Sequence, residues 1–428
     1  MSTVITKIIT ALESRLRTDV RYVLSGGSWL IANQIGSFFI TFGFLWVFTN
    51  FLPKEIYGEY RFITTAASLL AITTLPGMGI AVAQSVAKGN TGMIKQVMRT
   101  KIIWGLLGSS LAVLTAGYYW LANDPRLALL FLCVAVAVPF LESFAIHLHY
   151  LNGIQKFRRY ASTRIIQRSI VALCTIIALL LSGDIVIIIA TFFLSSIVGD
   201  FLMYLTTLKA YPPSTKTDPG VIPYGMHLSV MSALRLGAQY VDKIMLWYVL
   251  GPVSVASYVV AMAIPQEMTS GVSNISKLAL PKMSIRSKTA LRQSLLRKTK
   301  IFALLTIPLI IGYILIAPYI FTYIFPQYSD ITGYSQFAAL IIIFSANGLL
   351  MQYFYATENK KVLYVQNIFE PLILLTLFAI LIPAFGIWGA IIALLGKNLA
   401  LTILLIVAFM RDRTDPEQPG NVPDTFAT

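Results

Sequence analysis

Long apolar segments separated by short loops run along the whole chain, and they constrain the fold more than any other feature. An apolar run of about twenty residues is what a helix needs to cross the hydrocarbon core of a bilayer, which is about 30 Å thick. Only 12% of the 428 residues are charged, whereas soluble domains average about 25%. The chain therefore lacks the polar surface of a water-soluble protein, and we predict an all-α integral membrane protein.

The apolar segments predict about twelve transmembrane helices. The fifth and sixth are the least distinct, because only Gly183 and Asp184 separate them. The expected spans are 26–50, 62–86, 102–122, 127–151, 165–182, 185–206, 225–250, 255–280, 301–325, 335–355, 362–383 and 387–410.

Lysine and arginine are concentrated in alternate loops. The loops after the second, fourth and eighth spans are strongly basic, with Lys95, Arg159 and Arg292 as examples. The opposite loops contain few basic residues, and acids such as Glu55 and Asp124 partly offset them. Because cytoplasmic loops carry an excess of positive charge, we expect these loops and both termini to be cytoplasmic. The net charge of +15 then faces anionic lipid head groups, and nucleic-acid binding is not expected.

A proline-rich polar stretch near the middle divides the chain into two halves of six spans. We expect a cytoplasmic N-terminal segment at 1–24, which is either an interfacial helix or an ordinary cap. An N-lobe at 25–208 and a C-lobe at 224–410 are joined by a cytoplasmic linker at 209–223. A disordered cytoplasmic tail follows at 411–428.

The two halves resemble each other weakly. Pro53 matches Pro252 at an offset of 199 (252 − 53), and Tyr160 matches Tyr364 at an offset of 204 (364 − 160). Similar offsets at separate places favour a duplication. With an even number of spans in each half, the two lobes are related by a pseudo-twofold axis along the membrane normal, and the substrate is expected between them.

Four short motifs follow one another along the chain, each in or beside a predicted span. They are LPKEIYGEY at 52–60, LNGIQKF at 151–157, DKIML at 242–246 followed by LGP at 250–252 and Tyr258, and FGIWGAIIA at 385–393. In this order the chain, from about residue 25 to 410, resembles the multidrug/oligosaccharidyl-lipid/polysaccharide exporter superfamily. The likeness is greatest to its polysaccharide-synthesis branch, the Wzx-type O-antigen flippases. That pattern usually has Gly before the tyrosine of the second copy, where this chain has Ser257.

The resemblance implies a flippase in the bacterial inner membrane. Its substrate would be a polyprenyl-pyrophosphate-linked oligosaccharide, such as an O-antigen or exopolysaccharide repeat unit, moved by alternating access. A glycan polymerase and a chain-length regulator would be partners in the same membrane, and H+ or Na+ could be coupled to transport. The alternatives are a cation-coupled multidrug antiporter of the same superfamily and a flippase for a lipid-linked peptidoglycan precursor.

A membrane enzyme that transfers glycans is less consistent with the sequence. Such an enzyme usually needs a sizeable extramembrane loop or a nucleotide site, and the outer loops are short. We therefore expect no catalytic residues and no cofactor. Cys133 and Cys174 lie inside apolar runs as small hydrophobic residues, and His147 and His149 lack a third ligand for a metal site.

Ionisable residues at membrane depth are rare and usually face a cavity or a partner. Arg235 is the most informative, because a guanidinium group suits a phosphate bidentately; a structural ion pair with Asp242, Glu267 or Glu370 is the alternative. Lys397 is a second substrate candidate. The acids Glu142, Asp242, Glu267 and Glu370 are candidates for ion coupling or charge pairing, Glu370 with Lys397 in particular.

Neutral polar residues complete the candidate lumen. Gln239 follows Arg235 at helical spacing, while Asn33, Gln34 and Gln84 lie on the first two spans, where they could bind sugar or bridge helices. Asp242 and Lys243 are expected to form a self-compensating pair. Arg168 is expected to anchor its span at the cytoplasmic interface, and Asp200 to lie near that end of its own span.

Overall fold

The computed structural model describes residues 20–277, 288–357 and 359–412. Within these ranges the chain is helical and contains no strand, as the sequence predicted. Most of the predicted segment 1–24, residues 278–287 at the end of the eighth span and the start of the next loop, and most of the tail 411–428 lie outside the described residues. The rest of that predicted loop, from Lys288 on, is helical. The chain divides into two compact units, Met1–Ser257 and Tyr258–Thr428.

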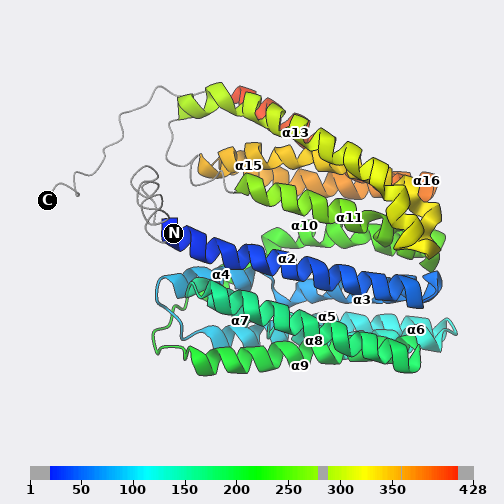
Figure 1. Ribbon diagram of the computed structural model, residues 1–428. Coiled ribbons are helices and arrows are strands. Elements are labelled where there is room, and N and C mark those ends of the chain that lie inside the picture. Colours follow the sequence, from blue (N-terminus) through cyan, green and yellow to red (C-terminus); the bar gives the residue numbers. More distant parts are fainter. Residues whose placement is uncertain (1–19, 278–287, 358, 413–428) are drawn as a thin grey trace, which may run out of the picture. The chain divides into compact units, whose positions relative to one another are not determined.

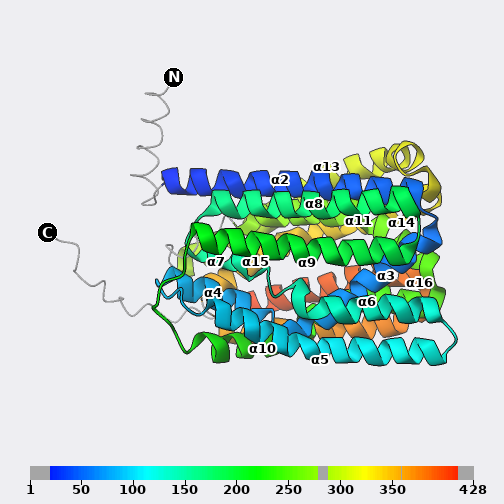
Figure 2. The same ribbon diagram turned by 90° about the horizontal axis from the view of Figure 1, so that it is seen from below.

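The first unit is a bundle of long helices that pack side by side (Figure 1). α2 packs on α8, α8 on α9, and α5 on α6, while α10 packs on α3 and α4. Figure 2 shows α2, α8 and α9 running alongside one another. The elements are α2 (Val20–Phe51), α3 (Lys54–Leu70), η1 (Ala71–Thr74), α4 (Gly77–Ala87), α5 (Ile94–Leu121), α6 (Pro125–Leu141), α7 (Ile146–Gly153), α8 (Phe157–Ser182), α9 (Ile185–Ala210) and α10 (Val221–Leu250); α11 (Pro252–Lys277) begins in this unit and continues into the second.

The second unit contains α13, which packs on the segment η3 and on α15, and α15 also packs on α16. Leu350, Phe354 and Leu405 form part of its core. Its remaining elements are α13 (Lys288–Tyr323), η2 (Pro326–Ile331), α14 (Thr332–Ala338), η3 (Ala339–Ala346), α15 (Asn347–Ala356) and α16 (Lys360–Arg411).

Local sequence signals decide where helices end. Asp184 caps α9 by accepting a hydrogen bond from the backbone N–H of Val186 at 2.7 Å, and Gly183 ends α8 in the left-handed region at φ 65°. Glycine adopts this conformation without steric cost. The fifth and sixth predicted spans are therefore two separate helices.

The longest helix contains a break. α16 has 52 residues, which at 1.5 Å per residue would extend about 78 Å, more than two hydrocarbon cores of about 30 Å. Gly386, with φ 59° and ψ −129°, interrupts it. The eleventh and twelfth predicted spans are thus the two arms of α16, which we call the first arm (360–385) and the second arm (387–411).

The described helices account for all twelve predicted spans. Eight are long and apolar enough to cross a membrane, and the bent pair formed by Lys54–Thr74 and Gly77–Ala87 makes a ninth. The second arm of α16 adds one more, and α10 and α11, which carry more polar residues, correspond to the seventh and eighth spans. The chain is therefore a multi-pass membrane protein.

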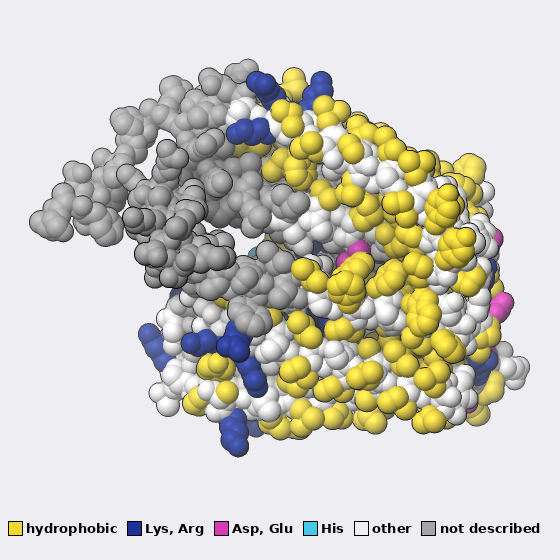
Figure 3. All heavy atoms as spheres, in the orientation of Figure 1, with side chains coloured by type: hydrophobic (Ala, Val, Ile, Leu, Met, Phe, Trp, Pro, Cys, Tyr) yellow, Lys and Arg dark blue, Asp and Glu magenta, His cyan; other side chains and the backbone are white. Residues whose placement is uncertain are grey.

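The helix surfaces fit this assignment. Large apolar side chains such as Leu114 and Val136 in the first unit and Leu305 in the second are about 70% exposed. Figure 3 shows hydrophobic side chains along the helices of the first unit, with lysine and arginine gathered near one end. An apolar surface of this extent is suited to lipid, not to water.

Candidate functional site

The first unit contains a cavity of about 590 Å³, which we call the N-cavity. Its wall is built by α2, α3, η1, the end of α6, α8, α9 and α10. The size is typical of a pocket for a small molecule or a head group. Its charged and polar lining residues are Thr41, Thr64, Ser68, Glu142, Arg164, Gln167, Arg168, Ser196, Asp200 and Tyr240.

A break in the fourth span brings Glu142 to this cavity. Pro139 lacks a backbone N–H, so the helix around it loses a hydrogen bond, and α6 ends at Leu141. Ser143 donates its hydroxyl hydrogen to the Pro139 carbonyl oxygen at 2.6 Å. Irregular backbone at membrane depth is tolerated where it lines a cavity, and Glu142 lies at such a place.

One face of α8 supplies the cations of the N-cavity. Arg164, Gln167 and Arg168 recur at the three- and four-residue spacing that puts side chains on one face, and all three line the cavity. Gln167 Nε2 donates a long hydrogen bond of 3.5 Å to Asp200 on α9. Asp200 is only 7% exposed. The N-cavity therefore contains two guanidinium groups and two carboxylates.

The second unit contains a separate cavity of about 460 Å³, which we call the C-cavity. It lies between α11, η3, α15 and the second arm of α16. Lys397 is the one charged residue among those that line it. The neutral hydrogen-bonding residues of its lining are Gln266, Thr269, Ser270, Ser273, Ser345, Asn347 and Asn398.

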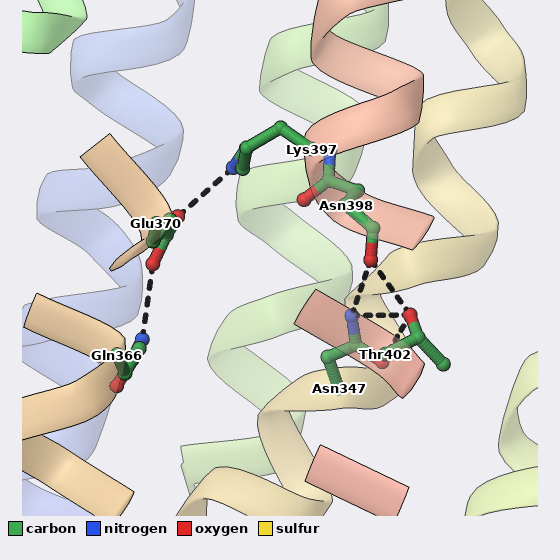
Figure 4. Close-up of polar contacts among 6 residues, drawn as sticks. All are labelled: Asn347, Gln366, Glu370, Lys397, Asn398 and Thr402. Atoms are coloured by element: carbon green, nitrogen blue, oxygen red, sulfur yellow. Dashed lines mark hydrogen bonds and ion pairs between the residues drawn. The ribbon is translucent and has the colours of Figure 1, made fainter. Parts of the chain in front are cut away.

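An ion pair between the two arms of α16 adjoins the C-cavity (Figure 4). Lys397 Nζ on the second arm lies 2.9 Å from Glu370 Oε1 on the first, and the two side chains are 14% and 19% exposed. Gln366 Nε2 donates to Glu370 Oε2 at 3.2 Å. Glu370 is not part of the lining, and it neutralises the one cation that is.

A second polar cluster holds α15 to the second arm (Figure 4). Asn347 Nδ2 donates to Thr402 Oγ1 at 2.8 Å, and the same hydroxyl lies within 2.8 Å of the Asn398 carbonyl oxygen and 3.0 Å of Asn347 Oδ1. Asn347 and Asn398 both line the C-cavity, so this cluster fixes their positions at its wall.

Part of the lining of the two cavities comes from equivalent spans. The C-cavity is lined by the eighth, tenth and twelfth spans, and the equivalent second, fourth and sixth spans line the N-cavity together with the first, fifth and seventh. The offset of 199 relates Ala67 to Gln266 (266 − 67), and the offset of 204 relates Phe193 to Lys397 (397 − 193); all four residues line their cavity. This equivalence is what a duplication predicts.

The chain matches one protein-family model. Residues 23–285 match the model described as "Polysaccharide biosynthesis protein", which is more than half of the 428 residues. The chain belongs to this polysaccharide biosynthesis family. The comparison with curated proteins gave no match.

Solved structures show that this polysaccharide biosynthesis protein shares its fold with known transporters. One similar structure is titled "Lipid II flippase MurJ, inward closed conformation", with a TM-score of 0.67 and 17% identity over 92% of this chain and 94% of that one. Another is an outward-facing multidrug resistance MATE family transporter of the MOP superfamily, with a TM-score of 0.59 and 13% identity over 89% and 93%. The expected fold is thereby confirmed, and the family match confirms the expected polysaccharide-synthesis family.

The structure places two of the predicted site residues in the cavities. Glu142 lines the N-cavity and Lys397 the C-cavity, and Glu370 pairs with Lys397. Asp242 pairs with Lys243 at 2.9 Å, as expected. The remaining candidates are absent from both linings: Asn33, Gln34, Gln84, Arg235, Gln239 and Glu267.

Arg235 lies close to the N-cavity without lining it. Its neighbour Leu236 and the residue Tyr240, also on α10, are part of the cavity wall. The Nε atom of Arg235 is buried and has no hydrogen-bond partner among the described residues. A substrate-binding role for Arg235 stays a prediction.

Sequence reasoning missed the residues of α8 and α9 in the N-cavity. Arg168 was expected to anchor its span at the interface and Asp200 to lie near a span end, yet both line the cavity. The spacing of Arg164, Gln167 and Arg168 was the available signal, because three polar side chains on one face of an apolar helix need a polar environment. Thr269, Ser270 and Ser273 of α11 line the C-cavity. They are uncharged, so the sequence contained no comparable signal for them.

Proposed function

We propose that the protein is a flippase that moves a lipid-linked saccharide across the bacterial inner membrane by alternating access. The expected substrate is a polyprenyl-pyrophosphate-linked oligosaccharide, such as an O-antigen or exopolysaccharide repeat unit. Membership of the polysaccharide biosynthesis family supports this proposal, as does a fold shared with a structure titled as a lipid II flippase.

The N-cavity is the observation that carries the proposal. A pyrophosphate and its sugars cannot cross hydrocarbon without a polar environment, because each unsatisfied polar or charged group there costs several kcal/mol. Arg164 and Arg168 offer two guanidinium groups on one helix face, and guanidinium binds phosphate through two parallel hydrogen bonds. Gln167, Tyr240 and the hydroxyl residues of α3 add groups that can bond sugar.

The wider assignment follows from the same function. We infer that the basic loops and both termini face the cytoplasm, where a lipid-linked saccharide would be loaded. A glycan polymerase and a chain-length regulator would act on the product, and H+ or Na+ coupling would involve the carboxylates. In this assignment the protein is a transporter and breaks no covalent bond.

A transport assay tests the proposal directly. The purified full-length protein is reconstituted into proteoliposomes containing a polyprenyl-pyrophosphate-linked oligosaccharide, and transbilayer movement is followed by the accessibility of the sugar to an impermeant glycosidase. We expect movement with the native chain and at least a roughly tenfold lower rate with Arg164→Ala and Arg168→Ala combined. Arg99→Ala is the matched control, because Arg99 is exposed near the start of α5. Equal rates for all chains, or none for the native one, would contradict the proposal.

A cation-coupled drug antiporter is the second candidate. The carboxylates Glu142 and Asp200 in the N-cavity favour it, since acids attract cationic drugs, and MATE transporters share the fold. Drug efflux from proteoliposomes under an imposed proton or sodium gradient separates the two candidates. Efflux that Asp200→Asn abolishes, without movement of the lipid-linked oligosaccharide, would establish the antiporter.

Lipid II in the same flipping assay tests the peptidoglycan-precursor alternative.

A further inference from the structure

We propose that the C-cavity is a subsite for an uncharged saccharide, and that Glu370 excludes anions from it by holding Lys397. This assignment rests on the proposed flippase function, because it names the part of a lipid-linked saccharide that this cavity would take. It is carried by three features of the second unit: the neutral polar lining, an unpartnered hydroxyl and the ion pair of α16.

The C-cavity is lined by groups that match sugar hydroxyls. Its polar lining consists of hydroxyl and amide side chains from α11, η3, α15 and α16, with Lys397 as the one charged residue. Hydroxyl and amide groups both donate and accept hydrogen bonds, as the hydroxyls of a saccharide do. The N-cavity differs, since its lining includes two arginines and two acidic residues.

Ser345 provides an unused hydrogen-bonding group at the wall of the cavity. It is 4% exposed, and its Oγ has no partner among the described residues. Many hydroxyls in the spans bond back to their own helix, as Ser196 does to the Phe192 carbonyl at 2.7 Å. Ser37 and Thr207 also have a buried hydroxyl without a partner among the described residues, but Ser345 is the one of these three that lines the C-cavity. A buried hydroxyl without a partner is costly, and a ligand hydroxyl in the C-cavity would supply the missing bond.

The backbone at Ser345 is also unusual. Ser345 lies in η3, a 3₁₀-helix of eight residues within the tenth span, and 3₁₀ runs longer than three or four residues are uncommon and often mark functional positions. Ile341 and Phe344 from the same segment line the cavity beside it. The tighter helix therefore lies at the cavity wall.

Asn347 is held in place before any ligand arrives. Its Nδ2 donates to Thr402 Oγ1 at 2.8 Å, and the cluster includes the carbonyl oxygen of Asn398. Ordering a side chain on binding costs free energy, and a side chain that is already fixed avoids this cost. Asn347 Oδ1, which accepts from Thr402 Oγ1 at 3.0 Å, can thus accept one further hydrogen bond from a ligand in a fixed orientation.

The ion pair of α16 disfavours an anionic ligand. A phosphate bound to Lys397 would either meet the negative charge of Glu370, whose Oε1 lies 2.9 Å from Nζ, or displace that carboxylate. Separation of the pair would leave Glu370 as an unpaired carboxylate with a side chain only 19% exposed, which is unfavourable. A neutral saccharide needs no such separation.

Ligand binding to the purified full-length protein in nanodiscs tests this inference. The probes are three neutral disaccharides (maltose, lactose and N,N′-diacetylchitobiose) and inorganic pyrophosphate, and saturation-transfer NMR and thermal shift give the affinities. We expect at least one disaccharide to bind the native chain, with an affinity lowered at least tenfold by Ser345→Ala. Thr306→Val is the control, because Thr306 is buried, bonds the Ala303 carbonyl and is not part of the cavity lining.

Glu370→Gln tests the role of the ion pair. We expect at least a tenfold gain in pyrophosphate affinity, lost again when Lys397→Gln is added, with disaccharide affinity unchanged within twofold. Glu267→Gln, which removes an acid of α11 outside the cavity lining, should leave pyrophosphate affinity unchanged. Size-exclusion profiles establish that each variant folds.

The outcomes separate this inference from the proposed function. Absence of disaccharide binding, or pyrophosphate binding by the native chain that depends on Lys397, overturns the saccharide subsite even if the protein flips a lipid-linked oligosaccharide. Disaccharide binding that depends on Ser345, without flipping, supports the subsite and counts against the flippase.

Discussion

Gly58 in α3 lies directly against the carbonyl group of Pro252, the first residue of α11. The two residues belong to the motifs that the internal repeat relates, LPKEIYGEY and LGP. The structure therefore brings the two copies of the repeated motif into contact within the first unit. A side chain at position 58 would occupy the space of that carbonyl.

We expect Gly58→Ala to lower the free energy of unfolding by about 1–3 kcal/mol, since overpacking displaces backbone. Gly117→Ala is the matched control, because no atom lies within 4 Å of the position that its Cβ would take and alanine favours the helix. Unfolding by SDS in mixed micelles measures both variants. Equal stability of the two would show that the contact with Pro252 is not tight.

Gly386→Ala should also destabilise the protein, by about 1–3 kcal/mol, because φ 59° with ψ −129° is strained for any residue with a Cβ. This break lets the two arms of α16 fold beside each other, and Gly389 lies against the Leu381 carbonyl within it. Gly333→Ala, at a glycine with open space around it, is the control. Thermal denaturation in detergent gives the comparison.

Asn347 and Thr402 should be coupled only modestly. A double-mutant cycle with Asn347→Ala and Thr402→Val is expected to give a coupling free energy of about 0.6 kcal/mol, and below about 2 kcal/mol, as for other hydrogen bonds between membrane helices. SDS unfolding of the four chains measures it. A coupling of zero would mean that the 2.8 Å hydrogen bond does not stabilise the contact between α15 and α16.

Arg235→Ala should slow movement of the lipid-linked oligosaccharide, and Arg235→Lys should restore little of it, because lysine lacks the planar fork that binds phosphate. The buried Nε of Arg235 has no hydrogen-bond partner among the described residues, and a phosphate oxygen of the substrate would supply one. The glycosidase-accessibility assay measures the rates. An unchanged rate would remove Arg235 from the mechanism.

The orientation can be tested with cysteines in the loops. In a chain with Cys133→Ala and Cys174→Ala, a cysteine at exposed Lys88 should react with an impermeant maleimide only after the membrane is permeabilised. A cysteine at exposed Ser182 should react from the outer face. The reverse pattern would place the termini outside and contradict the prediction from the basic loops.

The local part of the site could be predicted from the sequence. Charged residues interrupt the apolar pattern at Glu142, Glu370 and Lys397. Because burying a charge in a membrane is costly, such residues are expected to face a cavity or to pair with one another. The residues of α8 were harder to recognise, because arginine near a span end usually reaches the interface along its own flexible chain. Only the packing of α8 beside α9 shows that Arg164, Gln167 and Arg168 share a cavity with Asp200.

The sequence by itself determined that the chain lies in a lipid bilayer, how many spans it has and where many of its helices end. These follow from the length of apolar runs and from residues such as Asp184 and Gly386, whose effects act on the nearest backbone. Only the tertiary structure decided which polar groups share a cavity, since this depends on the rotation and depth of helices distant in sequence. Ser345 is the clearest case: a serine in an apolar run has no periodic signal, and its hydroxyl becomes an unpartnered group in the C-cavity only through the packing around η3.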